Sequence, residues 1–290
     1  MTPAVRAAIE QALQARVERA VPISGGDISD TFRLELSDRR RVFVKTNHQA
    51  PAGMFEAEAH GLAWLRAANA IAVPEVLAYK SFGQQGRGGF LALEWLEPGH
   101  KSRDFDQRLG EGLAALHRYG APGFGLDRDN FIGRLTQSNR HHDRFRDFFV
   151  EQRLLPQFEL AVCNGHFDRA FRTDFARLLG RLGGLLGPDE PPARLHGDLW
   201  SGNCVVGPNG VPWLVDPAAY GGHRELDLGM MHLFGGFSER VFDAYAECYP
   251  LLPGVPERIR LMQLYPLLVH VNLFGGGYVA SVRRIVGDYL

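Results

Sequence analysis

The chain has 290 residues, of which 45% are hydrophobic and 22% are charged, and its formal net charge is −1. This composition excludes a disordered polymer, and the balanced charge excludes an overall field that would favour nucleic acid or an anionic membrane. The three cysteines lack a CxxC spacing, which argues against a disulfide scaffold or a structural zinc site and favours a reducing compartment.

The first hundred residues predict mixed α and β structure. Val5, Ile9, Leu13 and Val17 recur at helical spacing among charged residues of both signs, which indicates an amphipathic helix and not a signal or transit peptide. No apolar run approaches the roughly 20 residues needed to cross a bilayer, so we expect a cytoplasmic protein. Within 23–36, a glycine turn is followed by an alternating stretch with Phe32, Leu34 and Leu36 on one face, which predicts a strand. Alternation and helical periodicity also predict strands at 41–45, 75–79 and 90–96, and a helix at 54–68.

Beyond residue 97 the pattern becomes helical. Leucine and phenylalanine recur at helical spacing in three segments, at about 109–117, 171–185 and 257–290. We therefore predict an α+β protein of two lobes. A small β-rich lobe covers residues 1–97, its last strand forms a hinge near 94–97, and a larger, mainly helical lobe covers residues 98–290.

The stretch HGDLWSGN, from His196 to Asn203, carries the strongest chemical signal. Short strands are expected at 204–206 and 213–215 with a Pro-Asn-Gly turn between them, so a hairpin would bring Asn203 close to Asp216. Asp198 lies on the loop that leads to the same place. Two carboxylates and an amide oxygen at one edge suit Mg²⁺, which binds a few protein oxygens together with phosphate oxygens.

The same order of residues occurs in kinases, where an aspartate, an asparagine five positions beyond it and a second aspartate after a hairpin serve catalysis and metal binding. Here Pro-Ala follows Asp216 in place of Phe-Gly, which favours the small-molecule kinases over protein kinases. The tripeptide HGD alone would fit an ordinary turn equally well. The ordered set is much harder to explain by structural need.

The small lobe offers a matching set for a nucleotide. Lys45 ends a predicted strand and would hold the α- and β-phosphates, and either Glu56 or Glu58 on the next helix would pair with it. A lysine at a strand end is more often simply solvated. Gly25, Gly26 and Ser29 lie in a turn that would cover the phosphates, although a Gly-Gly pair is a weak signal.

At this point the chain resembles the fructosamine kinase (ketosamine 3-kinase) family, within the aminoglycoside phosphotransferase and choline kinase superfamily. The resemblance implies a protein-kinase-like fold, ATP and Mg²⁺ as cosubstrates, and phosphate transfer to O3 of a ketosamine in deglycation repair. It implies that Asp198 is the base, that Asn203 and Asp216 hold the metal, and that Glu58 pairs with Lys45. The stretches that carry it are 55–62, 130–133, 151–157, 196–203, 216–227, 233–237 and 267–277.

The remaining site residues are weaker predictions. The backbone of Glu94 and Leu96 would bind adenine at the hinge, although a buried strand would look the same. Trp200 would stack on the sugar or its amine, or else anchor the loop. His270 is expected either at the wall of the acceptor site or as a core histidine. We also expect His223 and Glu225 near the acceptor site, with an ion-paired turn as the equal alternative, and Asp227 as an anchor for the catalytic loop.

Three functions remain open from the sequence. The first is a ketosamine 3-kinase that is a monomer or weak homodimer, acts on a small glycated amine and has no nucleic-acid or membrane partner. The second is a kinase for another hydroxylated amine, such as an aminoglycoside or choline. The third, a non-catalytic nucleotide-binding regulator, is disfavoured because Lys45, Asp198, Asn203 and Asp216 are all present.

Overall fold

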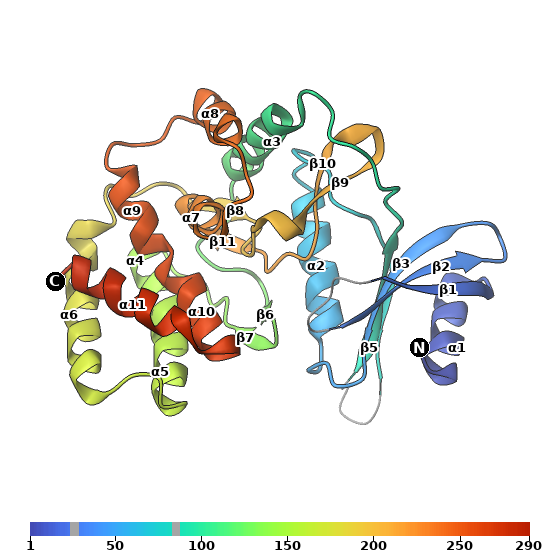
Figure 1. The fold of residues 1–290 in the computed structure, drawn as a ribbon, viewed down its shortest axis with the longest axis horizontal. Helices are drawn as coiled ribbons and strands as arrows, with labels where there is room; N and C mark the ends of the chain where they lie inside the picture. The colour runs from blue at the N-terminus through green and yellow to red at the C-terminus, as the bar shows by residue number, and fades with distance from the viewer. Residues whose placement is uncertain (24–28, 83–87) are drawn as a thin grey trace.

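The fold begins with a five-stranded antiparallel sheet of strand order β1-β2-β3-β5-β4. The structure is a computed structural model that describes residues 1–23, 29–82 and 88–290 (Figure 1). The predicted strands are confirmed within the described residues, and one more strand precedes them. The bounds are β1 Val17–Ile23, β2 Asp30–Leu36, β3 Arg41–Asn47, β4 Val76–Ser81 and β5 Gly89–Glu94.

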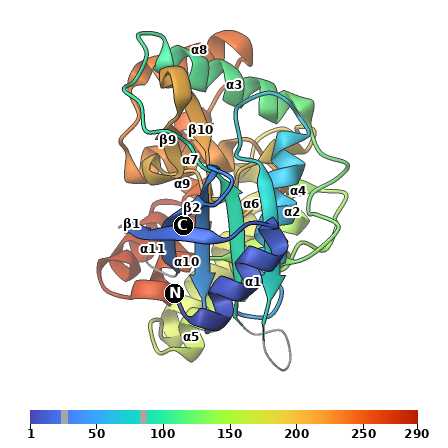
Figure 2. The ribbon, with the colours of Figure 1, turned by 90° about the vertical axis from the view of Figure 1, so that its right-hand side faces the viewer.

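Helix α1, Pro3–Leu13, covers one face of this sheet (Figure 2). Val5, Ile9 and Leu13 are buried in one core cluster with alternate residues of β2, β3 and β5. The residues alternate because successive side chains of a strand point to opposite faces of the sheet. The prediction that the helical stripe continues to Val17 is wrong. Gln14 ends the helix with a φ of 54°, in the left-handed region, and Val17 begins β1.

Helix α2, Met54–Arg66, lies on the opposite face, between the sheet and the helical part of the chain (Figure 1). Phe55, Leu62 and Leu65 are buried as the periodicity predicted. They belong to a core cluster that also contains Leu93 of β5 and Leu113 of the next helix, α3. The cluster thus contains residues from both sides of residue 97, where we predict the boundary between the two lobes. That boundary stays a prediction.

The rest of the chain is mainly helical, around a second and larger apolar core. The predicted helices are confirmed, and that at 257–290 is divided into three. Two short strand pairs, β6–β7 and β8–β11, and the hairpin β9–β10 carry the polar residues discussed below. The bounds are α3 Phe105–Tyr119, β6 Asn130–Ile132, β7 Leu135–Gln137, α4 Phe145–Phe148, α5 Leu155–Cys163, α6 Arg169–Leu185, β8 Ala193–Leu195, β9 Cys204–Val206, β10 Pro212–Leu214, β11 Tyr220–Gly222, α7 Glu225–Phe234, α8 Glu239–Cys248, α9 Val255–Met262, α10 Leu264–Phe274 and α11 Gly277–Asp288.

The segment between α4 and α5 is a π-helix, Phe149–Leu154, which the sequence did not predict. The α4, π and α5 segments follow one another without a break, so together they form one helical rod interrupted by a wider turn. Phe158 in α5 stacks on Phe175 of α6 with 3.9 Å between the ring centres. No helix among the described residues is long and apolar enough to cross a membrane.

Candidate active site

The hairpin β9–β10 brings together the two predicted metal-binding residues. Its register pairs Cys204 with Leu214, so Asn203 and Val215 face one another just outside it, and the Val215 amide donates to the Asn203 carbonyl at 3.0 Å. The side-chain amide of Asn203 lies 3.5 Å from the Asp216 carbonyl oxygen. The local sequence therefore places both residues at one end of the hairpin, as expected.

Asp198 completes this group. Asn203 Nδ2 donates to the Asp198 carbonyl oxygen at 2.8 Å and to Asp198 Oδ2 at 3.2 Å. Burial and, after it, the negative charge of Asp216 raise the pKa of Asp198 to about 7, although the hydrogen bond from Asn203 lowers it. A carboxylate with a pKa near the working pH is a suitable general base.

Asp227 holds the backbone of the loop from His196 to Asn203, which is the predicted catalytic loop and is called the catalytic loop below. This anchoring role was predicted. The Asp227 carboxylate accepts hydrogen bonds from the amides of His196, at 2.8 Å, and Gly197, at 2.9 Å, and lies 3.2 Å from His117 Nε2. Gly197 has a φ of +82°, and a Cβ there would lie 2.1 Å from the carbonyl oxygen of Ala218. These contacts fix the direction in which the loop leaves β8.

His117 is a contributor to this anchor that the sequence analysis missed. It is 1% exposed, and its second ring nitrogen lies 2.9 Å from the Tyr245 hydroxyl. The sequence feature that could have identified His117 is its position on α3, four residues after Leu113 and therefore on the buried side of the helix. A histidine on an apolar stripe needs buried partners, and Asp227 is one of them.

Lys45 connects the sheet to the hairpin. Its Nζ lies 2.8 Å from Glu58 Oε1 and also contacts Asp216 Oδ1. Burial opposes its charge, but the carboxylates of Asp216 and Glu58 outweigh this effect and raise the pKa of Lys45. Glu56, the alternative partner, instead pairs with Arg128 at the surface at 3.4 Å. The structure therefore selects Glu58.

A chain of contacts runs from the loop of Trp200 through the end of α7 to His270. The Trp200 side chain is 43% exposed, and its indole lies over Gly202, where a Cβ would come within 2.2 Å of the ring. A Cβ on Gly236, just after α7, would lie 2.5 Å from Ser201 Oγ, so the end of α7 adjoins the loop. His270 contacts Phe234, the last residue of α7, with 4.7 Å between ring centres.

His270 belongs to an aromatic group formed by α7, α10 and α11. Its ring lies 5.0 Å from the ring of Tyr278 and 5.5 Å from that of Phe274, which is 61% exposed. Its Nδ1 donates to the Pro266 carbonyl at 2.8 Å, and burial lowers its pKa, so the ring is neutral at pH 7. It is therefore a half-buried ring with an aromatic surface beside it.

The structure does not bring His223 and Glu225 to Asp198. Antiparallel pairing of β11 with β8 sets Gly222 opposite Ala193, at the end of the pair away from the catalytic loop. Glu225 is fully buried, and both its carboxylate oxygens bind Arg258, at 2.7 to 3.1 Å. The expected acceptor role of these two residues is thus not met, and the ion-paired turn holds instead.

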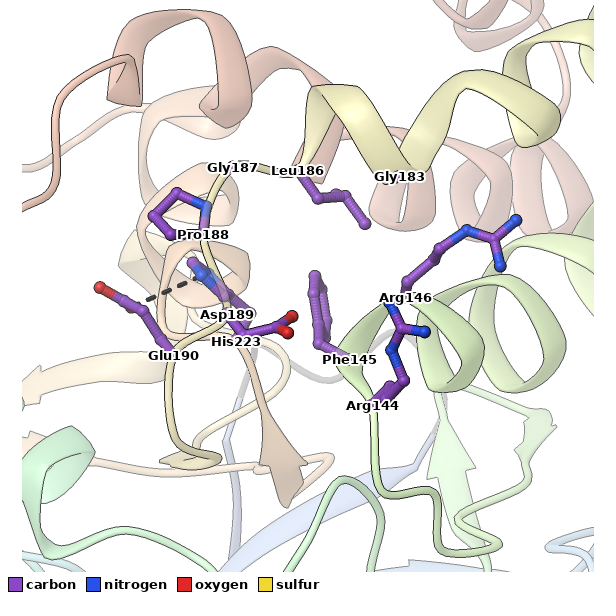
Figure 3. A pocket seen from close by; sticks show the side chains of 10 residues that line it. All are labelled: Arg144, Phe145, Arg146, Gly183, Leu186, Gly187, Pro188, Asp189, Glu190 and His223. Carbon is purple, nitrogen blue, oxygen red and sulfur yellow. Dashed lines mark ion pairs between the residues drawn. The ribbon is translucent and has the colours of Figure 1, made fainter.

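His223 lines a small cavity together with Phe145 and Glu190 (Figure 3). Its ring is 5.0 Å from that of Phe145, and its Nε2 is 3.5 Å from Glu190. Burial lowers the pKa of His223 to about 4, so the ring is neutral at pH 7. Arg224 takes both oxygens of Glu190, at 2.6 and 2.7 Å, which completes a buried ionic cluster.

The remaining nucleotide predictions lie at the sheet. Gly25 and Gly26 fall outside the described residues, and Ser29 directly precedes β2. Glu94 is the last residue of β5, and its carboxylate accepts a hydrogen bond at 2.7 Å from the backbone amide of Glu75, the residue before β4. Leu96 follows in an extended stretch outside any helix or strand, half-buried. Their adenine-binding role stays a prediction.

Comparison with known proteins adds the family to this geometry. A model of the fructosamine kinase family matches residues 1–290. A relative from Synechocystis, described as a probable ketoamine kinase, is 39% identical and covers 95% of this chain and 91% of its own. The protein-ribulosamine 3-kinase of Oryza sativa subsp. japonica is 37% identical over 92% of this chain and 77% of its own.

Solved structures show the same fold. A crystal structure from Thermobifida fusca, described as a candidate fructosamine-3-kinase, has a TM-score of 0.89 at 37% identity and covers 100% of this chain and 99% of its own. An aminoglycoside phosphotransferase in complex with AMP-PNP and hygromycin B has a TM-score of 0.67 at 18% identity, covering 98% of each chain. The predicted protein-kinase-like α+β fold is confirmed.

Proposed function

The chain belongs to the fructosamine kinase family, and we propose that it is an ATP-dependent ketosamine 3-kinase that acts in deglycation repair in the cytoplasm. The observation that carries the proposal is the convergence of Asp198, Asn203 and Asp216 with the Lys45–Glu58 pair. These residues come from β3, α2, the catalytic loop and the hairpin. A fold that needed only stability has no reason to collect them in one place.

The reaction follows from these positions. Asp198 orients the O3 hydroxyl of the sugar and accepts its proton, the oxygen forms a bond to the γ-phosphorus, and the bond to the β-phosphate oxygen breaks to release ADP. The transition state of such transfers is loose, so positioning and charge neutralisation do most of the catalysis. Lys45, kept charged by Glu58 and Asp216, supplies one positive charge for the phosphates.

The donor set fits magnesium. Asn203 directs its amide nitrogen at Asp198 and Asp216, which turns its Oδ1 to the other side. Lys45 contacts Oδ1 of Asp216, and within the described residues no other side chain pairs with the Asp216 carboxylate. Among the described residues no three His, Cys, Asp or Glu side chains form a complete metal site. Two protein oxygens with phosphate oxygens are what Mg²⁺ commonly uses, and the ion would neutralise charge between the β- and γ-phosphates.

Replacing Lys45 with Met is expected to weaken AMP-PNP binding by at least about 10-fold and to lower kcat by about 100-fold, because the phosphates lose their buried cation. Binding is measured by calorimetry and kcat by ADP release. The matched control is Lys80→Met, on the exposed end of β4 in the same sheet. Equal effects of the two substitutions would contradict the role of Lys45.

We further propose that Trp200 and the aromatic group around His270 receive the acceptor. The exposed indole stands two residues after the base, and an aromatic face attracts the cationic or sugar portion of a glycated amine. Trp200→Ala should raise KM for the ketosamine about 10-fold or more and leave KM for ATP within about twofold. Tyr79→Ala, which removes a similarly exposed aromatic ring from β4, is the control.

The proposed activity is tested by ADP production with ribulosamines, fructosamines, choline and aminoglycosides as acceptors. A ketosamine 3-kinase should phosphorylate the first two classes, with the phosphate on O3 by NMR. Turnover with choline or an aminoglycoside alone would move the assignment to the second function. ATP binding without turnover on any acceptor would favour the non-catalytic regulator.

A further inference from the structure

A network of five buried polar side chains lies behind the catalytic loop, and the reaction described above does not use it. Three of its members are amides, Asn130 on β6, Gln137 at the end of β7 and Asn139 just beyond it. All three are at most 4% exposed. Arg153, on the π-helix, and the Tyr265 hydroxyl, on α10, bind these amides from the other side. We call this set the amide network.

Every amide in the network has a single orientation that satisfies its neighbours. Gln137 Nε2 donates to Asn130 Oδ1 at 2.8 Å and to the Ala218 carbonyl at 3.1 Å, while its Oε1 accepts from the Tyr265 hydroxyl. Asn130 Nδ2 donates to the Ala219 carbonyl at 2.8 Å. Exchanging oxygen and nitrogen on Gln137 would set its oxygen against two groups that can only accept, Asn130 Oδ1 and the Ala218 carbonyl. The network is therefore directional and specific.

Arg153 fixes the far end of the network. It is fully buried, and no carboxylate pairs with it among the residues that the structure describes. Its guanidinium donates to Asn139 Oδ1 at 2.6 Å and to the Ser138 carbonyl at 2.6 Å, and lies 3.8 Å from the ring centre of Tyr220. A buried charge held by carbonyls and an aromatic face tolerates little movement of those partners.

The two backbone carbonyls that accept hydrogen bonds from the network belong to Ala218 and Ala219, two and three residues after Asp216. The Ala218 amide donates to the His196 carbonyl at 3.0 Å, and the Ala219 Cβ lies 3.5 Å from where a Cβ on Gly61 of α2 would be. Asp216 has a φ of +55°, a conformation that residues with a Cβ rarely adopt. Such a backbone persists when its surroundings over-determine it.

We propose that the amide network is a positioning device for the metal-binding carboxylate. By holding the carbonyls of Ala218 and Ala219 it keeps Asp216 in its left-handed conformation, with the carboxylate beside Lys45 and the backbone carbonyl beside Asn203. Asn130, Gln137 and Tyr265 are thus positioning residues for phosphate transfer. This inference rests on the proposed function, since it concerns the metal and nucleotide of the same site.

The test is Gln137→Met, which keeps the length of the side chain and removes its hydrogen bonds to Ala218, Asn130 and Tyr265. Calorimetry measures the affinity for AMP-PNP with Mn²⁺ and again with EDTA. We expect the affinity for the manganese complex to fall about 10-fold and that for metal-free AMP-PNP to stay within twofold. Amide exchange at Ala218 should become at least 10-fold faster, while α6 keeps its protection.

Thr136→Val, on the exposed side of the same strand, is the control and should change neither quantity. Tyr265→Phe removes a single hydroxyl and should give a smaller loss of the same kind, so it decides the matter if Gln137→Met does not fold. Unchanged manganese dependence in a folded variant, or equal loss with and without Mn²⁺, would overturn the inference. Because no acceptor is present, a failure of the proposed ketosamine activity leaves this result readable.

Discussion

Replacing Asp198 with Asn should abolish phosphate transfer and at the same time make the protein more stable. The amide keeps the shape of the side chain and can still accept the hydrogen bond from Asn203, but it cannot take the proton of the sugar hydroxyl. We expect kcat to fall at least about 1,000-fold with AMP-PNP binding within about threefold.

The stability gain follows from the raised pKa of Asp198. Well below pH 3.8 the carboxyl is neutral in both folded and unfolded chains and costs nothing. As pH rises from 3.8 to about 7 the unfolded carboxyl ionises first, so the folded state of the wild type loses stability progressively. Above pH 7 the penalty is complete, and the rise in the pKa of Asp198 from 3.8 to about 7 corresponds to about 4 kcal/mol by which Asp198→Asn should then be more stable.

Thermal unfolding of the two proteins from pH 4 to pH 8 measures this difference. The gap in stability should be smallest at pH 4 and largest at pH 8. Asp174→Asn, at an exposed ion pair on α6, is the matched control and should change neither activity nor the pH dependence. A variant that turns over normally, or one destabilised at pH 8, would contradict the assignment of the base.

Replacing Glu225 with Ala should destabilise the protein strongly and leave acceptor binding unchanged. Arg258 is buried, and its guanidinium would lose both carboxylate oxygens at once. Breaking a buried ion pair from one side costs about 3–5 kcal/mol, since the remaining charge stays uncompensated. Urea unfolding gives the loss, and KM for the ketosamine, measured on the folded fraction at low temperature, should stay within twofold.

The double variant Glu225→Met with Arg258→Met is the control for this result. It removes both charges and fills the space with apolar atoms, so it should regain most of the stability that Glu225→Ala loses. A 10-fold rise in KM without loss of stability would instead return Glu225 to the acceptor site. The two outcomes therefore separate the buried-pair role from the role that the sequence predicted.

The parts of the fold that could be predicted are those with a local pattern. The stripe of Val5, Ile9 and Leu13 and the hairpin between Asn203 and Asp216 are written within a few residues, and the structure contains both. The group of Asp198, Asn203 and Asp216 was predictable because all three residues lie within a few positions of the two ends of one hairpin. Lys45 could be added because it lies on a strand that precedes a helix with an acidic residue, although the strand continues past it to Asn47.

The failures arise where a distant segment decides. The position of Glu225 depends on Arg258, 33 residues later, and on the antiparallel pairing of β11 with β8. Val17 fits the helical spacing, but a hydrogen-bonded partner in β2 turns it into a strand residue. Gln137 looks like an ordinary polar residue until α10 and the segment after Asp216 close around it. None of these partners can be read from neighbouring residues.

The π-helix Phe149–Leu154 makes the number of residues in this segment critical, because a deletion here would change how the flanking helices face one another. Deleting one residue there would restore regular α-helical spacing, and it would also rotate everything on one side by about 100° relative to the other. After such a deletion, Arg153 could not bind Asn139 while Phe158 stacks on Phe175. The wider π-turn is what allows one continuous helical segment to make both contacts. At this point the number of residues matters as much as their identity, and a single-codon deletion would separate the apolar core from the network behind the metal site.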